Sequence, residues 1–253
     1  MMLRMEVDMR YFTVIAYDGT RYRGWQRQGN TQDTISARIE AVLSRLDGSA
    51  VEIEGAGRTD AGVHAMGQGC TFTLQGSHAP QDVQDYLNTY LPEDIAVLSC
   101  ETAQARFHAR LSSVGKVYRY EIRLSKTPDV FRHKYQWHLG KPLDIECMER
   151  AAKALCGTHD YRAFCTAAPK KRSTVRTVQS ISFSEDQGTL SITFAGDGFL
   201  YNMVRIMVGT LVSIGMHATE PEEIPQILLS GVRAQAGPTA PAQGLCLMKV
   251  LYP

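Results

Sequence analysis

The sequence lacks several features by which the class of a protein is often recognised. Lys and Arg number 27 against 26 Asp and Glu, so the net charge is +1 and no basic field covers the whole chain. There is no Gly-x-Gly-x-x-Gly pattern and no Gly-Lys-Ser/Thr, which leaves dinucleotide and nucleoside-triphosphate sites without support. Apolar residues make up 44% and charged residues 21%, a composition that excludes disordered and fibrous classes.

The six cysteines form no Cys-x-x-Cys pair, and the segment from Met1 to Arg10 has no apolar run of the signal-peptide type. Together these favour a reduced compartment, the cytoplasm. One spacing resembles a zinc site and comprises Cys147, Cys156, His159 and Cys165. Because Cys147 and Cys156 fall on a predicted helix and no two-cysteine knuckle is present, core thiols are favoured and no metal is expected.

Basic residues are grouped in four short clusters. These are Arg21, Arg23 and Arg27; Arg106, His108 and Arg110; Lys116 and Arg119; and Lys170, Lys171, Arg172 and Arg176. Solvated surface charge is the simpler interpretation of any single cluster. Four of them in a nearly neutral chain nevertheless favour a grooved site for a polyanion.

The first half of the chain predicts the element order β-α-β-β-α-β. Strands are expected at 11–16, 51–54, 70–74 and 95–98, where apolar and polar residues alternate or short apolar runs occur. Helices are expected between a cap at Asp33 or Thr34 and Gly48, and again from Pro80. This order is that of a ferredoxin-like unit.

The second half repeats this outline with additions. Strands are expected at 117–124, 175–183, 190–194 and 245–251, and helices at 143–155, at 201–216 and from Pro221. The chain is therefore predicted to be α+β, with two ferredoxin-like halves, 1–108 and 109–253, on either side of a cleft. The first half would carry the catalytic loop and the second would complete the cleft.

Arg205 lies near the start of the almost wholly apolar helix predicted at 201–216. A helix of this length is shorter than the roughly 20 apolar residues that span a bilayer, so we expect it to be buried. A buried guanidinium keeps its proton and needs a carboxylate or phosphate partner. Unless Arg205 reaches the surface from the first turn, Asp60 is the best candidate for that partner.

Asp60 belongs to the segment with the strongest candidate chemistry. Glycines at 55, 57, 62, 67 and 69 allow sharp turns and close approach to a ligand. Between them lie the polar residues Arg58, Thr59, Asp60 and His64. A hairpin turn in which the Asp side chain bonds its own backbone explains the composition equally well, and the residues alone leave both interpretations open.

The run from Gly57 to Ala65, Gly-Arg-Thr-Asp-Ala-Gly-Val-His-Ala, resembles the catalytic signature of the tRNA pseudouridine synthase A family. Other segments resemble the family in the same order: Tyr17 to Thr20, Gly24 to Gln28, Asn88 to Ile95, Phe107 to Arg110, Tyr118 to Tyr120, Gly157 to Tyr161, Phe199 to Gly209, and Gly244 with Leu245. Two departures are visible: Ser36 stands where the family usually has glutamine, and Leu111 where it tends to have phenylalanine.

This resemblance implies a pseudouridine synthase fold with a central mixed or antiparallel sheet. It implies isomerisation of uridine to pseudouridine in the anticodon stem-loop of tRNA, at tRNA positions 38 to 40 in the family. Asp60 would be the nucleophile and would attack either the ribose at C1′ or the uracil at C6. The target base would leave its stack. No cofactor is needed, and the family implies a homodimer.

The resemblance also implies roles for further residues. Tyr118 would stack on the flipped uracil and Leu245 would form an apolar wall of the pocket. Arg58 would fill the vacated space or hold the flanking phosphate. The pairing of Arg205 with Asp60 is expected from the charge of a buried guanidinium and not from the resemblance. The clusters at Arg21, Arg23 and Arg27 and at Lys170, Lys171 and Arg172 would bind RNA phosphates; His64 is expected to be structural. The alternatives are a non-catalytic RNA-binding protein and an N-glycosidase, the latter usually needing a second carboxylate.

Overall fold

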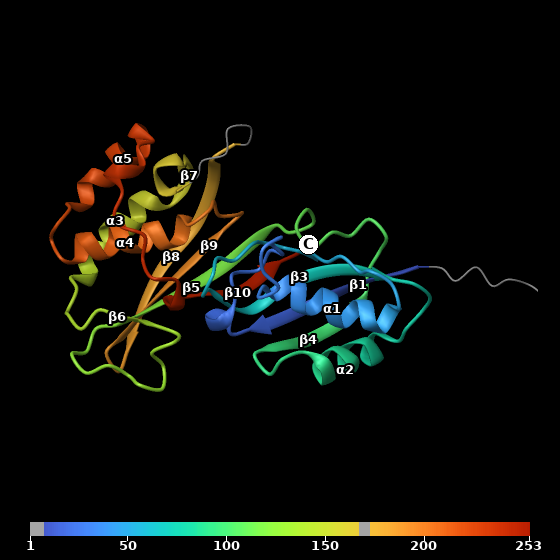
Figure 1. The fold of residues 1–253 in the computed structure, drawn as a ribbon. Helices are drawn as coiled ribbons and strands as arrows, with labels where there is room; N and C mark the ends of the chain where they lie inside the picture. The colour runs from blue at the N-terminus through green and yellow to red at the C-terminus, as the bar shows by residue number, and fades with distance from the viewer. Residues whose placement is uncertain (1–7, 167–172) are drawn as a thin grey trace, which may run out of the picture. The chain divides into compact units, whose positions relative to one another are not determined.

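The chain forms two compact units in a computed structural model that describes residues 8–166 and 173–253 (Figure 1). Unit 1 comprises Met1–Val114 and Leu247–Pro253, and unit 2 comprises Gly115–Cys246. The chain returns to unit 1 within its last strand, β10 (Leu245–Leu251). The functional division expected at 1–108 and 109–253 stays a prediction.

Unit 1 has the predicted element order β-α-β-β-α-β. Its elements are β1 (Met9–Tyr17), α1 (Ile35–Asp47), β2 (Glu54–Gly55), β3 (His64–Leu74), α2 (Pro80–Tyr90) and β4 (Ile95–Thr102), with a short 3-10 turn, η1, at Gly19–Arg21. The strands pair antiparallel in the order β4-β1-β3-β2, which is the ferredoxin-like arrangement. Helices α1 and α2 contact each other, and α2 packs on β4 (Figure 1).

Two strands of unit 1 differ from the prediction. The strand expected at 51–54 is reduced to Glu54–Gly55, because α1 binds the backbone before it: Val51 N–H donates to Ser44 Oγ at 2.9 Å, and Ile53 N–H to Glu40 Oε1 at 3.3 Å. In contrast, β3 begins at His64 rather than near residue 70. The glycines at 67 and 69 interrupt the alternation of apolar and polar side chains by which a strand is recognised in a sequence, so the first part of β3 was not predicted.

Helix α1 begins and ends at the predicted residues. The Thr34 side chain caps the first turn by accepting a hydrogen bond from Ala37 N–H at 3.4 Å. Gly48 ends the helix with φ +73°, and its N–H donates to Ser44 O at 3.1 Å. The apolar face, which includes Ile39 and Leu43, is buried.

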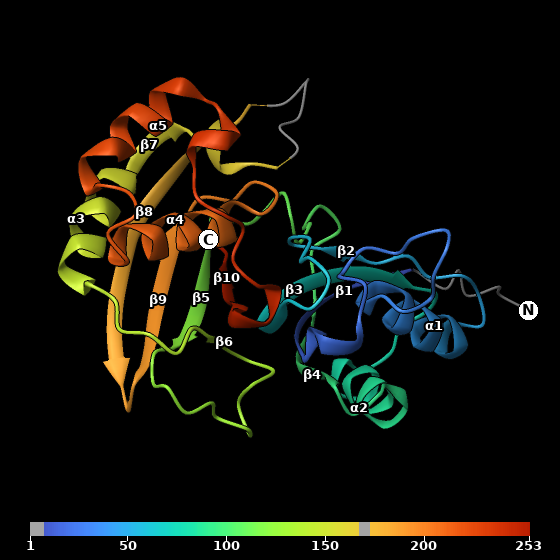
Figure 2. The same ribbon diagram turned by 60° about the vertical axis from the view of Figure 1, so that its left-hand side comes forward.

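Unit 2 is a sheet covered on one face by helices. Its elements are β5 (Gly115–Arg123), β6 (Trp137–His138), α3 (Ile145–Leu155), β7 (Gly157–Asp160), η2 (Arg162–Phe164), β8 (Val175–Asp186), β9 (Thr189–Gly196), α4 (Met203–Gly215), η3 (Pro221–Glu223), α5 (Ile224–Ser230), η4 (Arg233–Gln235) and η5 (Ala242–Gly244). The order β5-β9-β8-β7 is antiparallel throughout, and β6 adds a short parallel pair to β5. Figure 2 shows α3, α4 and α5 on the same face of this sheet.

The predicted hairpin and the predicted buried helix of unit 2 are both confirmed. Gln187 and Gly188 turn the chain between β8 and β9 with φ +47° and +73°, so Asp186 pairs with Thr189. Helix α4 is buried except at Arg205 and Ser213. None of the helices within 8–166 and 173–253 has both the length and the apolar character to cross a membrane.

Candidate active site

The loop between β2 and β3 is shaped by close packing around its glycines. Gly55 lies against the buried indole of Trp25, and a Cβ at this position would be 2.4 Å from Trp25 Cε2. Gly62 has φ +77°, which is unfavourable for other residue types. Val63 N–H donates to Asp60 O at 3.2 Å, so the chain turns immediately after Asp60. The hairpin-turn interpretation is therefore correct for the backbone and is compatible with a functional side chain.

The segment from Tyr17 to Trp25 holds this loop in place. Trp25 N–H donates to Thr59 O at 3.0 Å, and the Tyr17 and Thr59 hydroxyl oxygens are 2.8 Å apart. Gly24 has φ +95°, and a Cβ there would lie 2.7 Å from Thr59 O. Both the backbone and the side chain of the residue before Asp60 are thus fixed by a segment more than thirty positions earlier in the chain.

Strand β3 supports the loop from its other end. The side chain of Gln68, which is fully buried, donates from Nε2 to Gly57 O at 2.8 Å. Ala56 N–H donates to Gly69 O at 2.8 Å. Because both ends of the loop are tied, Asp60 is presented on a rigid backbone.

The side chains of the loop differ in exposure. Thr59 is buried, Asp60 is partly buried and Arg58 is exposed. His64 is 5% exposed, and its Nδ1 accepts a hydrogen bond from Gly19 N–H at 3.0 Å, with Asp18 Oδ1 3.2 Å away. His64 therefore connects β3 to the turn that follows β1, in keeping with the structural role expected for it.

Tyr118 and Tyr120 lie on one face of β5, since side chains two residues apart in a strand point the same way. Tyr118 is 8% exposed and meets Phe199 edge to face, with the ring centroids 5.4 Å apart. The hydroxyl of Tyr120 donates to Pro241 O at 2.8 Å, and Gly244 packs directly on its ring. Leu245, which follows that glycine, is buried.

Arg205 lies in the first turn of α4 beside these residues. Its Nε donates to Ala240 O at 2.8 Å and its Nη1 to Asn202 Oδ1 at 2.9 Å. Tyr120 and Arg205 donate to the neighbouring carbonyls of Pro241 and Ala240, which places the two side chains near each other. Burial raises the pKa of Tyr120, and the charge of Arg205 partly opposes that rise. Unit 2 therefore gathers Tyr118, Arg205 and Leu245, which are far apart in sequence, around the buried ring of Tyr120.

Three residues of the candidate site were missed by sequence reasoning. Tyr17 and Trp25 hold the loop, and Tyr120 lies at the centre of the unit 2 group. Each belongs to a segment that matches the family, so the signal was present. Their roles depend on contacts between distant segments, which the residue pattern does not specify.

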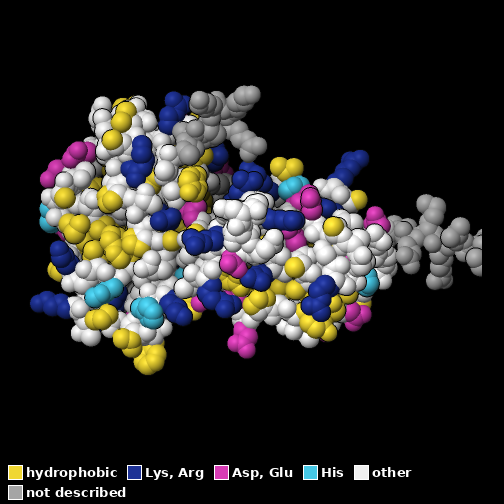
Figure 3. All heavy atoms as spheres, in the orientation of Figure 1, with side chains coloured by type: hydrophobic (Ala, Val, Ile, Leu, Met, Phe, Trp, Pro, Cys, Tyr) yellow, Lys and Arg dark blue, Asp and Glu magenta, His cyan; other side chains and the backbone are white. Residues whose placement is uncertain are grey.

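Two of the three predicted RNA-binding arginines of unit 1, Arg21 and Arg27, have acidic neighbours. Arg21 donates from Nε to Asp94 Oδ2 at 2.7 Å, and that bond raises the pKa of Arg21. Arg27 Nη1 is 3.6 Å from Glu40 Oε2, while Arg23 is exposed. On the face of the molecule in Figure 3, Lys and Arg side chains lie among acidic and apolar ones. The second predicted cluster, Lys170, Lys171 and Arg172, lies outside the described residues.

Ser36, one departure from the family pattern, has a defined contact. It is 2% exposed, its Oγ accepts from Arg27 N–H at 2.7 Å, and its own N–H donates to Trp25 O at 2.9 Å. The serine thus ties the start of α1 to the segment that supports the Asp60 loop.

The zinc spacing weighed in the sequence is not gathered into a site. Cys165 is buried, and His159 Nε2 is bonded to the backbone, at 2.9 Å from Cys156 O. Within 8–166 and 173–253, one other group of side chains could hold a metal ion, formed by Asp144, Cys147 and His217.

The sequence of the chain matches a family model described as tRNA pseudouridine synthase over residues 13–111 and 151–253. The chain belongs to this family. It is 46% identical over 242 residues to the tRNA pseudouridine synthase A of Bacillus sp. (strain KSM-64), covering 96% of this chain and 99% of that protein. It is also 46% identical over 239 residues to the tRNA pseudouridine synthase A of Moorella thermoacetica, covering 94% and 97%.

Among solved structures, the crystal structure of a Cbf5-Nop10-Gar1 complex matches 94% of this chain and 49% of that chain, with a TM-score of 0.41 and 13% identity. The sequence matches confirm the resemblance predicted from the Asp60 loop and its accompanying segments. They also confirm the predicted enzyme class, an isomerase that forms pseudouridine in tRNA.

Proposed function

We propose that this chain isomerises uridine to pseudouridine in the anticodon stem-loop of tRNA, with Asp60 as its nucleophile. The observation that carries the proposal is the way the loop is built. Thr59 is held by Trp25 N–H and the Tyr17 hydroxyl, so the neighbouring carboxylate of Asp60 needs little reordering before it meets a substrate. A loop whose only task was to reverse the chain would need none of these contacts.

A carboxylate suits this isomerisation because it can bond to carbon and later leave. In one route, Asp60 bonds to the ribose at C1′ as the bond from C1′ to N1 breaks. In the other it adds to uracil at C6 before that bond breaks. In both, uracil rotates, C5 bonds to C1′, Asp60 is released, and the proton on C5 is lost while N1 gains one. The net change is an isomerisation, so electrons and atoms balance without a cofactor.

We also propose that Tyr118, Arg205 and Leu245 contact the same uridine. The T-shaped packing on Phe199 leaves Tyr118 a restricted ring orientation, as stacking on a flipped base requires. Arg205 would pair with the carboxylate and keep it ionised. Arg58, exposed two residues before Asp60, would occupy the space that the base leaves or bind its flanking phosphate.

A tRNA labelled with tritium at uracil C5 provides the test of function. Wild-type protein should release tritium without releasing free uracil, since C5 becomes the new point of attachment. Asp60→Asn keeps the shape of the side chain and removes its charge, so tritium release should fall by at least about 10³-fold. Binding of tRNA in a gel-shift assay should be kept.

Asp82→Asn is the matched control, because Asp82 is an exposed aspartate in the first turn of α2. Its activity should equal that of the wild type. Full activity in Asp60→Asn would refute the nucleophile. If the wild type bound tRNA without releasing tritium, a non-catalytic RNA-binding protein would be favoured instead. If it released free uracil, an N-glycosidase would be favoured.

The position of the substrate uridine is tested separately. A short RNA with the sequence of an anticodon stem-loop should release tritium, and one with the sequence of the T stem-loop should not. The homodimer that the family resemblance implies, and the cytoplasmic location that the cysteine pattern favours, remain proposals of the same kind.

A further inference from the structure

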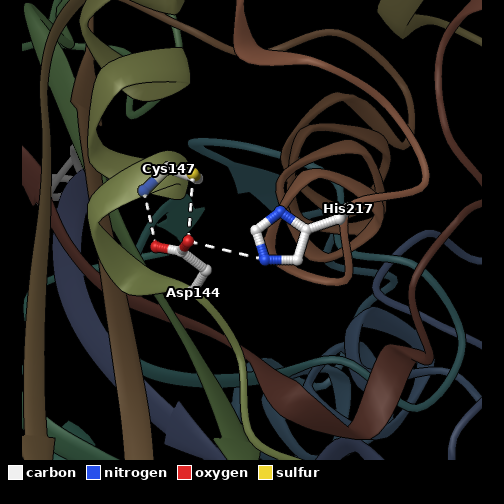
Figure 4. A group of neighbouring side chains, drawn as sticks. All are labelled: Asp144, Cys147 and His217. Atoms are coloured by element: carbon white, nitrogen blue, oxygen red, sulfur yellow. Dashed lines mark hydrogen bonds and ion pairs between the residues drawn. The ribbon is translucent and has the colours of Figure 1, made fainter.

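Three side chains of different chemistry meet on unit 2, at the start of α3 and just after α4. They are the carboxylate of Asp144, the thiol of Cys147 and the imidazole of His217 (Figure 4). We propose that they form a binding site for a divalent transition-metal ion, zinc in the first instance. The site lies apart from the residues proposed for the isomerisation and does not rest on the proposed function.

The two separations from Asp144 Oδ2 to the other donor atoms are close to those of a tetrahedral zinc site. Cys147 Sγ is 3.1 Å from Asp144 Oδ2, and His217 Nε2 is 3.5 Å from the same oxygen. All three donor atoms lie within 4.8 Å of one another. Tetrahedral zinc with usual bond lengths places sulfur and oxygen about 3.6 Å apart, and nitrogen and oxygen about 3.4 Å apart. An ion therefore requires side-chain shifts of only a few tenths of an ångström at these two edges.

The two oxygens of the Asp144 carboxylate have different partners. Oδ1 caps α3 by accepting a hydrogen bond from Cys147 N–H at 3.0 Å. Oδ2 faces the thiol and the imidazole, as Figure 4 shows. The cap orients the second oxygen as outer-shell hydrogen bonds orient metal ligands in known sites.

The backbone also holds the two ligand-bearing segments together. Asp144 N–H donates to Gly215 O at 2.9 Å, and His217 N–H donates to Ile214 O at 2.8 Å. A Cβ at Gly215 would lie 2.7 Å from Met148 Sδ, so α3 and the end of α4 are in direct contact. His217 has φ +57°, a conformation that is uncommon outside glycine.

The set of donors selects the class of ion. Magnesium and calcium bind oxygen ligands, whereas a thiolate with an imidazole favours zinc and neighbouring transition metals. Three protein ligands leave the fourth position to water. The thiol hydrogen bond to Asp144 Oδ2 would be replaced by a bond from sulfur to the metal, and the thiol proton would pass to solvent.

The site lies at the opposite end of α4 from Arg205. Arg205 and Gly215, ten residues apart in the helix, are separated by about 15 Å at a rise of 1.5 Å per residue. The ion would therefore join α3 to the end of α4 and stabilise unit 2, and would take no part in the chemistry at uridine.

The experiment uses the full chain, treated with a chelator, reduced, and titrated with Co²⁺ as a spectroscopic substitute for zinc. Binding should produce the near-ultraviolet charge-transfer band of a cobalt–thiolate bond, and Zn²⁺ should abolish it by competition. Excess Zn²⁺ should also raise the melting temperature, because the ion binds the folded state.

Cys147→Ser and His217→Asn should each weaken binding by more than about tenfold, and Cys147→Ser should remove the charge-transfer band. Asp144→Asn keeps an oxygen for the helix cap, so it should fold like the wild type and still bind the metal less tightly. Cys100→Ser and His133→Asn, at the partly buried Cys100 and the exposed His133, are the matched controls and should bind normally.

Absence of the thiolate band in the wild type, or a band that survives Cys147→Ser, would overturn the proposal. So would equal affinity in the wild type and His217→Asn. Tritium release by the metal-free and the zinc-loaded protein should be the same within error, which keeps this outcome separate from that of the proposed function.

Discussion

At the scale of single residues, the loop of Asp60 depends on glycines whose neighbours are already in place. Gly24, Gly55 and Gly62 serve different needs: the first and third have positive φ, and the second faces an indole ring. The backbone angles of Gly55 suit any residue, so conformation does not explain why a glycine is needed there. The reason is the indole ring of Trp25, which leaves no room for a side chain.

Gly55→Ala tests that requirement. The new Cβ would lie 2.4 Å from the ring of Trp25, which is buried. We expect a loss of about 1–3 kcal/mol in the free energy of unfolding. Activity should also fall by more than stability explains, because Trp25 N–H holds Thr59 next to Asp60. Chemical denaturation and tritium release measure the two effects.

Gly29→Ala is the control for this prediction, since no atom lies within 4 Å of a Cβ built there and its φ is not positive. It should leave both quantities unchanged. Equal stability and activity in Gly55→Ala and Gly29→Ala would show that the Trp25 ring moves away from the methyl group without a measurable cost in free energy.

Glu54, the first residue of β2, gives a residue-scale prediction of pH dependence. Its carboxylate interacts with Arg10 and accepts a hydrogen bond from Thr71 Oγ1 at 3.0 Å. Burial raises the pKa of Glu54, but the bonds from Arg10 and Thr71 outweigh it, and the pKa is lowered from its usual 4.5. The stabilisation is therefore fully present above about pH 4.5 and is lost as the pH falls through the lower, folded-state value.

The variant Glu54→Gln cannot titrate at this position. It should be less stable than the wild type at pH 7, and the difference should shrink as the pH falls below 4.5, the usual value for Glu54. Urea denaturation at a series of pH values measures this. Glu101→Gln, at an exposed position, should show no such convergence. A constant difference between Glu54→Gln and the wild type at every pH would contradict the assignment.

At the scale of elements, the helices of unit 1 follow from short stretches of sequence. Thr34 supplies the N-cap of α1 and Gly48 the left-handed residue that ends it. Strand boundaries behave differently. The strand expected at 51–54 loses its ladder bonds to side chains of α1, and β3 extends six residues earlier than its alternating apolar pattern. The residues that cap a helix lie next to it in the sequence, whereas the ends of a strand depend on the strand with which it pairs.

Gly48→Ala tests the cap at this scale. Its φ of +73° is costly for a residue with a Cβ, even though no atom lies within 4 Å of the position. We expect a loss of about 1 kcal/mol in the free energy of unfolding. Gly48→Asn should cost less, because asparagine adopts this conformation more readily. Equal losses in the two variants, measured by thermal and chemical unfolding, would argue against a purely conformational cause.

At the scale of the whole molecule, unit 1 is built from two segments that lie far apart in the sequence. Residues Leu247–Pro253 belong to unit 1, where Tyr252 packs edge to face on Phe12, with the ring centroids 5.0 Å apart. Its hydroxyl donates to Ala109 O at 2.8 Å, and burial raises its pKa. Gly69 has no Cβ, which leaves room for that hydroxyl. Residues Leu247–Pro253 therefore help to complete the core of unit 1, although they lie far along the chain from the rest of it.

Tyr252→Ala should accordingly destabilise unit 1. Removing a partly buried aromatic ring with its hydrogen bond should cost about 2–4 kcal/mol. Tyr201→Ala, at a ring that is 56% exposed, is the control and should cost far less. Hydrogen exchange on the intact protein should show faster opening of β1 and β3 in Tyr252→Ala. Protection equal to that of the wild type would mean that the chain end is dispensable.

The sequence by itself determined the α+β class, the order of the elements in unit 1, the caps of α1, the β8–β9 turn and the family. Each is written in local spacing or in a run of neighbouring residues. The short strands β6 and β7 of unit 2 were not predicted. The tertiary structure decided which segments meet: Trp25 against Gly55, Arg205 near Tyr120, and Asp144 with Cys147 and His217. These contacts depend on strand pairing and helix packing between residues far apart in the chain, and no local sequence pattern predicts them. The sequence of the loop was enough to identify Asp60 as a candidate. The contacts that keep this loop rigid became visible only in the folded structure.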